Sequence, residues 1–420
     1  MKVIILLVCF VATTSVWAKN VGLDELKRMT LENSYGVKSK EVDLRLSELN
    51  VGLAKSKLYP RLGVEVGKEW VKSDLLDESD DLASIYGEVN LFNGFKDSSL
   101  IKKEKINLKS AKIDLDNHKF NLGLEVEKAF YEYLYSKKKL SIISSEIKRT
   151  NTLSSLVKKR VSSKLLTDSD IIEFRLHQKK TRSFENYLKL EMEQLHSKLA
   201  VFTGIKNTGE LIVLGEIPHF KVNSTLEELI ENIVGGPRIK KLQFEGEVVD
   251  IEKKSSNSGW YPSLNLRAEH GRLDEIETGI SSSETSSKIT LRASWELFSG
   301  FETTKKRELQ QSKRIKIDYA KKQVKQDLSI LIKSKYKTLK VLEETIEFEE
   351  ENEKLAHKLY SKTLAEYKKG IKDSSALIDS SQKITESQNR VFELKLNYIL
   401  TKVSLEKSLG RQLDFTLVHQ

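Results

Sequence analysis

The stretch Asn90-Leu91-Phe92-Asn93-Gly94-Phe95 occurs a second time as Glu296-Leu297-Phe298-Ser299-Gly300-Phe301, 206 residues further along the chain. Gly204 and Gly410 are also 206 residues apart, and each follows a long segment free of proline. An internal repeat is the first feature to look for in a sequence, because it decides how the rest is divided. Here it indicates two similar halves that contain the same parts in the same order.

The repeat extends upstream of this motif. Leu58-Tyr59-Pro60-Arg61-Leu62 corresponds to Trp260-Tyr261-Pro262-Ser263-Leu264 at an offset of 202 residues, so four residues are inserted between the two landmarks. A link near residues 205–224 joins the halves. We therefore predict a first repeat over 19–220 and a second over 221–420.

Between the two landmarks of each half, apolar and polar residues alternate, as in strands with one apolar face. This predicts strand pairs over about 58–92 and about 260–298. The apolar positions are Leu62, Val64, Val66, Ile85, Val89, Leu91, Leu264, Leu266, Ala268, Ile289, Leu291, Ala293, Trp295 and Leu297. A lipid-facing wall with a wet interior requires this pattern. A soluble antiparallel sheet with one exposed face shows the same alternation and stays open as the alternative.

Polar loops are expected within each strand pair, at Ser73–Asp81 and Asp274–Ser287. Aromatic residues gather at the ends of the strand segments, as in the aromatic girdles of membrane proteins. They are Tyr59, Trp70, Phe92, Trp260, Tyr261, Trp295 and Phe298.

Helices are predicted on both sides of each strand pair. Residues 23–57 and 225–258 each indicate a short helix followed by a longer one. The segments of about 96–203 and about 302–409 contain no proline and one glycine each, and a helix over 96–160 would be roughly 100 Å long. So long a helix needs partners alongside it.

Apolar residues at three- and four-residue steps supply a coiled-coil-like seam for these long helices. The seam positions are Ile106, Ile113, Phe120, Leu124, Phe130 and Leu134, and then Ile317, Val324, Leu328, Leu331, Leu339, Leu342 and Ile346. Each segment has one break, at Arg160–Ile172 and at Tyr367–Asp379, which predicts a helical hairpin. Gly370 takes a positive φ at low cost, and the neighbouring Asp and Ser residues are good helix caps.

The N-terminus has the pattern of a secretory signal peptide, residues 1–18, with Lys2, the apolar stretch Val3–Ala12 and a small-residue cleavage site ending at Ala18. Cys9, the only cysteine, lies inside it. No later stretch contains eighteen consecutive apolar residues, so we expect any membrane crossing to use strands closed into a barrel.

The charge pattern and the scattered histidines argue against other functions. Lys and Arg exceed Asp and Glu by ten, but basic clusters such as Lys305-Lys306-Arg307-Glu308 contain acids and lie in helix-like segments, so no nucleic-acid partner is expected. No His pair has zinc-binding spacing, and no glycine-rich phosphate loop is present. We therefore predict neither an enzyme nor a bound cofactor or metal.

Taken in this order and present twice, these features resemble the TolC family of outer-membrane efflux proteins over essentially the whole predicted mature chain. The matching motifs are the Tyr-Pro start of a strand, the Leu-Phe-x-Gly exit into a long helix and the tip Tyr367-x-x-Gly370. The resemblance implies a mainly α fold with a membrane β-barrel. Long coiled-coil helices form an α-helical tunnel, and four strands per protomer contribute to a twelve-stranded barrel in a homotrimer.

The same resemblance implies where the protein acts and with what. The barrel would lie in outer-membrane lipid, and the tunnel would extend into the periplasm. Its tip would dock to a periplasmic adaptor (membrane fusion) protein, which belongs to an inner-membrane pump. The chain would then be the passive exit duct of a tripartite efflux or type I secretion system. A periplasmic coiled-coil adaptor is the alternative, but it should show one hairpin without a duplication.

Site residues follow from the resemblance position by position. Asp170, Tyr367 and Lys372 match a periplasmic tip latch, and Gly370 matches the hairpin turn. Asp379 matches an acid at the pore entrance, where the family's second acid is replaced here by Ala376. The first hairpin has Val161 and Lys164 in place of the usual Tyr and Gly. The alternative is that these residues are helix caps and solvated turn residues.

Overall fold

The computed structural model describes residues 19–73, 76–162, 168–205, 211–272 and 285–417. The predicted signal peptide, residues 1–18, lies outside the described residues, and so does Lys164. The chain divides into two compact units. The first contains the described residues up to Val37 with Lys119–Asn232 and those from Ser329 onward, and the second contains Lys38–His118 and Ile233–Leu328.

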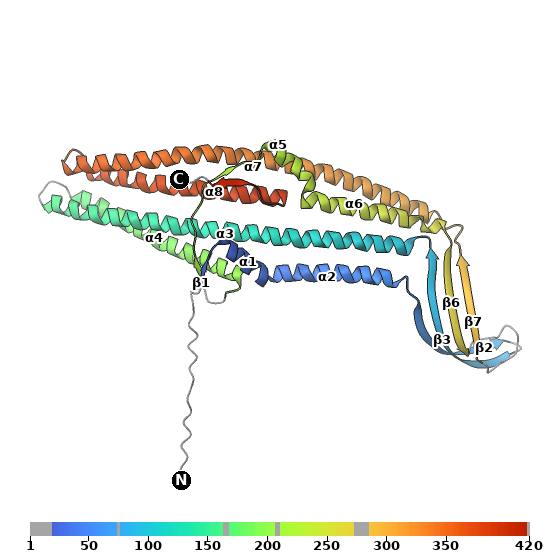
Figure 1. Cartoon of the computed structure of the whole chain (residues 1–420). Coiled ribbons are helices and arrows are strands. Elements are labelled where there is room, and N and C mark those ends of the chain that lie inside the picture. The colour runs from blue at the N-terminus through green and yellow to red at the C-terminus, as the bar shows by residue number, and fades with distance from the viewer. Residues whose placement is uncertain (1–18, 74–75, 163–167, 206–210, 273–284, 418–420) are drawn as a thin grey trace, which may run out of the picture. The chain divides into compact units, whose positions relative to one another are not determined.

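Each half of the chain contains one helix of 67 residues followed by one of 36 residues. They are α3 (Lys96–Ser162), α4 (Asp168–Thr203), α7 (Glu302–Lys368) and α8 (Ser374–Leu409). All four corresponding ends are 206 residues apart, the spacing of the sequence repeat. α3 and α4, like α7 and α8, form antiparallel hairpins (Figure 1). The predicted duplication and the two hairpins are therefore confirmed.

The shorter helices also follow the predicted order. They are α1 (Leu23–Asn33), α2 (Tyr35–Ser56), α5 (Leu226–Glu231) and α6 (Pro237–Ser256), with 3₁₀ turns η2 (Asn232–Gly235) and η3 (Asn257–Trp260). Thr225 and Glu228 form a reciprocal capping box at the start of α5. Pro237 opens α6 in its first turn, where a missing N–H costs nothing.

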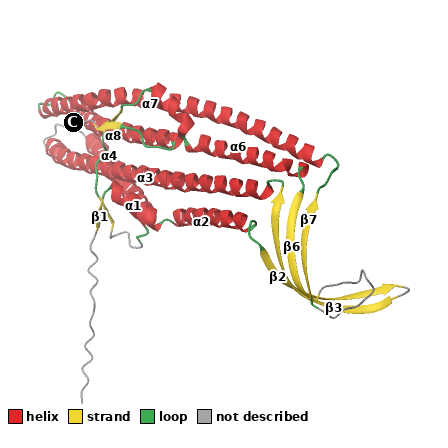
Figure 2. Ribbon diagram, turned by 45° about the vertical axis from the view of Figure 1, so that its right-hand side comes forward, coloured by secondary structure: helices red, strands yellow, loops and turns green. Residues whose placement is uncertain are grey.

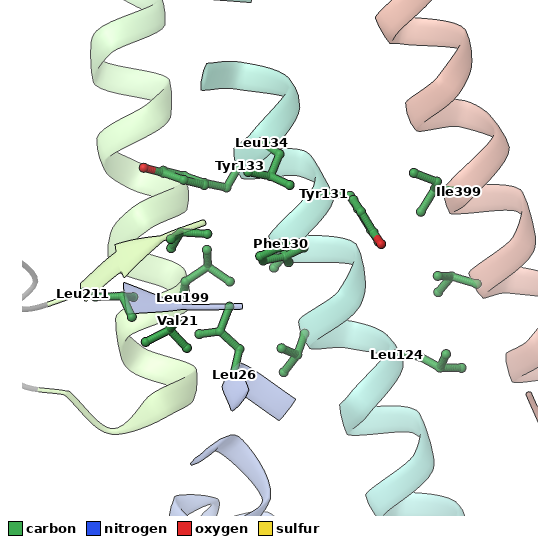
Figure 3. Packing of buried hydrophobic residues seen from close by; sticks show 14 of the residues in the cluster. Val21, Leu26, Leu124, Phe130, Tyr131, Tyr133, Leu134, Leu199, Leu211 and Ile399 are labelled. Atoms are coloured by element: carbon green, nitrogen blue, oxygen red, sulfur yellow. The ribbon is translucent and has the colours of Figure 1, made fainter. Parts of the chain in front are cut away.

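The core of the first unit surrounds α3 on two sides. On one side Phe130 lies toward Leu26 of α1 and Leu199 of α4, and on the other side Tyr131 and Leu124 lie toward Ile399 of α8 (Figure 3). Burying large apolar side chains of this kind contributes about 1.5–3 kcal/mol each. The predicted seam is buried at Leu124, Phe130, Leu134, Leu328, Leu339 and Ile346. Ile106, Ile113, Phe120, Ile317, Val324 and Leu342 are half-buried, and Leu331 is 36% exposed in the single chain.

A buried charge cluster joins α1, α3 and α8 in the same unit. The Glu127 carboxylate accepts from Lys27 Nζ at 2.6 Å and from Lys402 Nζ at 2.9 Å. Lys402 also reaches Glu406 at 3.1 Å, and Glu406 accepts from the Leu413 backbone N–H. Burial opposes ionisation of Glu127, but the two lysines outweigh it and lower its pKa. These charges are therefore paired rather than isolated in the core.

The second unit contains a four-stranded antiparallel sheet in the order β2-β3-β6-β7 (Figure 2). Its strands are β2 (Arg61–Ser73), β3 (Leu76–Asn93), β6 (Ser263–Arg272) and β7 (Ser286–Ser294). The hairpin of each repeat supplies two strands, and β3 and β6 join the repeats with Ile85 opposite His270 and one irregularity between Asn90 and Phe92.

One face of this sheet presents apolar side chains to the outside of the chain. Leu62 is 82% exposed, Val66 78% and Ile289 78%. On the polar face, the Arg267 guanidinium lies 4.2 Å from the centre of the Tyr86 ring and reaches Glu65 at 2.6 Å and Glu269 at 2.9 Å. The predicted alternation is present, but the apolar face covers no core of its own.

The strand boundaries differ from prediction in two places. Ser73–Asp81 is not an open loop, because β2 and β3 stay paired to Ser73↔Leu76 and include Trp70↔Ser79. Ladder hydrogen bonds with the partner strand here outweigh the low strand propensity of Asp and Ser. Trp295 and Leu297, which the alternation placed in the strand, lie beyond the end of β7 and do not pair with β6.

The repeated Leu-Phe-x-Gly-Phe motif makes the turn from strand to long helix. Gly94 and Phe95 have φ of 66° and 67°, and Gly300 and Phe301 have 61° and 67°. A left-handed phenylalanine is uncommon, so its occurrence at both equivalent positions shows that the two repeats share this turn geometry. A Cβ on Gly94 would lie 2.7 Å from the Ser258 backbone oxygen, which requires glycine at this position.

Four short strands lie near the link and the chain ends. β1 (Lys19–Val21) pairs in parallel with β4 (Leu211–Val213), and β5 (Phe220–Val222) pairs antiparallel with β8 (Phe415–Leu417). None of the helices among the described residues contains a segment apolar enough to cross a membrane.

Candidate functional site

The turn between α7 and α8 is closed by a glycine in the left-handed conformation. Gly370 has φ of 80°, and its N–H donates to Tyr367 O while Ile371 N–H donates to Glu366 O. These two bonds form a Schellman motif, which satisfies the last carbonyls of a helix. The Asp373 side chain then accepts from Ala376 N–H at 2.8 Å and caps the start of α8.

Tyr367 lies in an apolar cluster just inside this turn. It is 1% exposed and packs with residues from both hairpins. The cluster, which we call the tip cluster, consists of Leu153 and Val157 of α3, Phe174 of α4, Tyr367 of α7, and Leu377 and Ile378 of α8. Its members belong to four helices, so it holds the two hairpins together near their ends.

The other predicted tip residues are placed differently. Lys372 is exposed in the α7–α8 turn, and Asp379 is exposed on α8. Asp170 lies in α4, but its side chain is outside the described part of the chain. The structure therefore brings Tyr367 and Gly370 to one turn. The contacts of Asp170 with Tyr367 and Lys372 stay a prediction.

A buried polar cluster next to the tip cluster was missed by the sequence reasoning. Glu146 of α3 is 2% exposed and accepts hydrogen bonds from α4 and α8. The one signal in the sequence is its place on the apolar seam, between Ile142 and Leu153. A single sequence gives no means of finding partners that lie more than 200 residues away.

The environment of Glu146 keeps its carboxylate ionised. Burial by itself would raise its pKa, but hydrogen bonds from His177 and Thr385, together with the charge and hydrogen bond of Arg149, lower that pKa to about 2. The buried charge is thus fully partnered. Among the residues that the structure describes, no group of three or more His, Cys, Asp or Glu side chains is arranged to hold a metal ion.

Comparison with known proteins agrees with this architecture. The family model described as outer membrane efflux protein matches residues 26–165 and 237–411, one segment in each half of the chain. No curated protein is detectably similar to the chain in sequence.

Solved structures share the fold at low sequence identity. A membrane protein from Pseudomonas aeruginosa has a TM-score of 0.80 at 14% identity, covering 93% of this chain and 90% of its own. The outer membrane protein VceC from Vibrio cholerae has a TM-score of 0.79 at 14% identity, covering 93% and 97%. The open state of the MtrE outer membrane channel from Neisseria gonorrhoeae has a TM-score of 0.74 at 13% identity, covering 96% and 94%.

The family model covers about three quarters of the sequence in two repeated segments, and the long helices and four strands match the fold of channels of this kind. Its members are trimeric outer-membrane channels with a helical tunnel in the periplasm, and they are not enzymes. The chain therefore belongs to the outer membrane efflux protein family, also called the TolC family, and is an outer-membrane efflux channel.

Proposed function

We propose that three copies of the chain form one channel in which their sheets join into a single barrel. The observation that carries this is the sheet with an exposed apolar face and two edge strands, β2 and β7. In lipid every backbone polar group must be hydrogen-bonded within the protein, and four strands are too few to close on themselves. Three copies of four strands supply twelve.

The helices next to the edge strands support the same assembly. α2 leads into β2, and α7 follows β7. α2 carries an exposed apolar stripe at four-, three- and four-residue steps, formed by Val42, Leu46, Leu49 and Leu53. On α7, Ile315 and Tyr319 are exposed one turn apart. If β7 of one copy pairs with β2 of the next, α7 of the first copy lies beside α2 of the second. The apolar side chains of the two helices then cover each other.

In the first unit, α4 and α7 carry further exposed apolar side chains at coiled-coil spacing. On α4 they are Ile172, Leu176, Tyr187 and Leu190, and on α7 they are Val341, Phe348, Leu355 and Leu359. Apolar stripes of this length on water-exposed helices mark surfaces that another chain covers. We assign them to contacts between copies.

Disulfide crosslinking tests this assembly, because no cysteine follows Cys9 in the sequence. Val42→Cys and Ile315→Cys each lie roughly 20 Å along their helix from its sheet end. In the double variant we expect oxidation to give covalent trimers on a non-reducing gel. The control is the double variant Val42→Cys with Lys313→Cys. Position 313 points roughly 160° away from position 315 around α7, so this variant should stay monomeric on the gel. Monomers in both variants would contradict the assembly.

For transport, we propose that the channel is the passive exit duct of a tripartite efflux or type I secretion system, docking through its hairpin tips to a periplasmic adaptor and an inner-membrane pump. The exposed Ile371 beside the tip turn offers an apolar contact for such a partner. A photo-crosslinker at Ile371 should capture the adaptor in living cells, whereas one at Gly123, in mid-helix, should not. Equal labelling at both positions would argue against docking at the tip.

At the tip itself, we propose that Asp170, Tyr367 and Lys372 act as a latch and that Asp379 contributes charge at the pore entrance. The support is the position of Tyr367 and Gly370 in one turn and the exposure of Lys372 and Asp379 beside it. Partly screened pairs contribute about 0–1 kcal/mol each, which suits a contact that a docking partner must open.

A further inference from the structure

The feature that carries a new inference is a carboxylate on an apolar helix seam. Toward its end, α3 has a buried stripe at four-, four-, three- and four-residue steps, formed by Ile142, Glu146, Thr150, Leu153 and Val157. A charged group in such a stripe is costly unless every lone pair finds a donor. The partners of Glu146 therefore indicate the role of this carboxylate.

The partners of Glu146 come from three helices. Within α3, Arg149 Nη2 donates to it. From α4, His177 Nε2 lies 3.1 Å from Oε1. From α8, Ser381 Oγ donates at 3.0 Å and Thr385 Oγ1 at 2.7 Å to Oε2.

These partners also bind one another. Arg149 Nη2 donates to Thr385 Oγ1 at 2.7 Å, and Arg149 Nε donates to Ser381 Oγ at 3.3 Å. Each hydroxyl thus accepts a hydrogen bond from the guanidinium and donates one to the carboxylate. The single hydrogen of each hydroxyl is therefore used in a hydrogen bond. Gln382 Nε2 lies 3.1 Å from His177 Nδ1, so when that amide donates, Nδ1 is the acceptor and Nε2 carries the proton toward Glu146.

The network links the first hairpin to one helix of the second. Glu146, Arg149 and His177 belong to α3 and α4, while Ser381, Gln382 and Thr385 belong to α8. The buried carboxylate of Glu343 in α7 makes contacts of a different kind. It bonds Tyr398 Oη of α8 at 2.9 Å and Val222 N–H of β5, and so binds elements of the second half to each other.

Movement of α8 away from the first hairpin would break all the bonds from Ser381 and Thr385 at once. Glu146 would keep its contacts with Arg149 and His177 but would lose both hydroxyl donors of α8 together, so the contact of α8 with the first hairpin is lost in one step. We propose that Glu146 is a positioning residue that fixes α8 against α3 and α4 and thereby opposes widening of the tip of the duct.

This inference rests on the proposed function, because it assumes that the hairpin tips gate the duct. The test uses the purified full-length trimer in planar lipid bilayers. For Glu146→Ala we expect the ratio of open to closed dwell time to rise by roughly tenfold, equivalent to about 1.4 kcal/mol. Thr385→Val keeps the shape of the side chain and removes only the Thr385 hydroxyl, and it should change the ratio in the same direction. The control Glu343→Ala should leave it unchanged.

Hydrogen exchange on the same samples separates positioning from general loosening. Glu146→Ala should speed exchange in α8 around residues 381–385, and Glu343→Ala should speed it around Tyr398. Faster exchange around 381–385 with an unchanged dwell-time ratio would overturn the proposal, as would equal gating effects of both variants. If the wild-type protein forms no conducting trimer, the proposed function fails instead. If Glu146→Ala does not fold, Thr385→Val decides.

Discussion

Replacing Tyr367 distinguishes packing from latching at the hairpin tip. The side chain is 1% exposed and touches apolar residues of α3, α4 and α8. Tyr367→Ala empties this space, and removing a buried aromatic ring costs about 3–5 kcal/mol. Tyr367→Phe keeps the ring and removes only the hydroxyl, with a net cost of about 0.5–1.5 kcal/mol if its hydrogen bond is lost.

The measurement is hydrogen exchange at the tip of the folded protein. The cluster opens locally, so the lost free energy appears as faster exchange of amides in α8 near Leu377 and in α3 near Val157. A loss of at least ~3 kcal/mol predicts exchange more than ~100-fold faster for Tyr367→Ala, against roughly tenfold or less for Tyr367→Phe. The control is Lys368→Ala, an exposed neighbour at the end of α7, which should change exchange little.

Two outcomes would refute this reasoning. If Tyr367→Ala exchanges no faster than the Lys368→Ala control, the ring does not hold the hairpins together. If amides at the tip exchange as fast in Tyr367→Phe as in Tyr367→Ala, the hydroxyl rather than the packing of the ring holds the hairpins together. That second result would favour the latch in which Asp170 and Lys372 take part.

Three further predictions concern charged groups. Because the pKa of Glu146 is about 2 in the folded chain, below its ordinary value, its stabilisation is present above pH ~4.5 and is lost as the pH falls toward 2. The unfolding midpoint of the wild type should therefore exceed that of Glu146→Gln at pH 6 and converge with it at pH 2–3; a constant difference would contradict this. Asp170→Ala combined with Lys372→Ala should raise single-channel conductance, and an unchanged conductance rejects the latch. Asp379→Asn should reduce cation selectivity, seen as a smaller reversal potential across a salt gradient, and an unshifted potential would remove Asp379 from the pore entrance.

The sequence by itself determined the duplicated plan of this protein. The Leu-Phe-x-Gly-Phe motif, the alternation in the strands and the proline-free segments are local patterns, and each maps directly onto backbone conformation. The helices therefore begin and end where the 206-residue offset places them, and Gly370 takes the left-handed turn. The sequence did not predict the strand pairing within Ser73–Asp81, because hydrogen bonds with the partner strand there outweigh the low strand propensity of the residues.

The tertiary structure alone decided which side chains meet. Glu146 is only one more glutamate on a charged helix until α4 and α8 bring His177 and Thr385 to it. Likewise Tyr367 is a tip residue in the sequence but a core residue in the fold. Such contacts depend on which helix faces turn toward each other, and the partners of Glu146 lie 31 residues away for His177 and 239 residues away for Thr385. Periodicity defines the face of each helix, and only packing selects its partner.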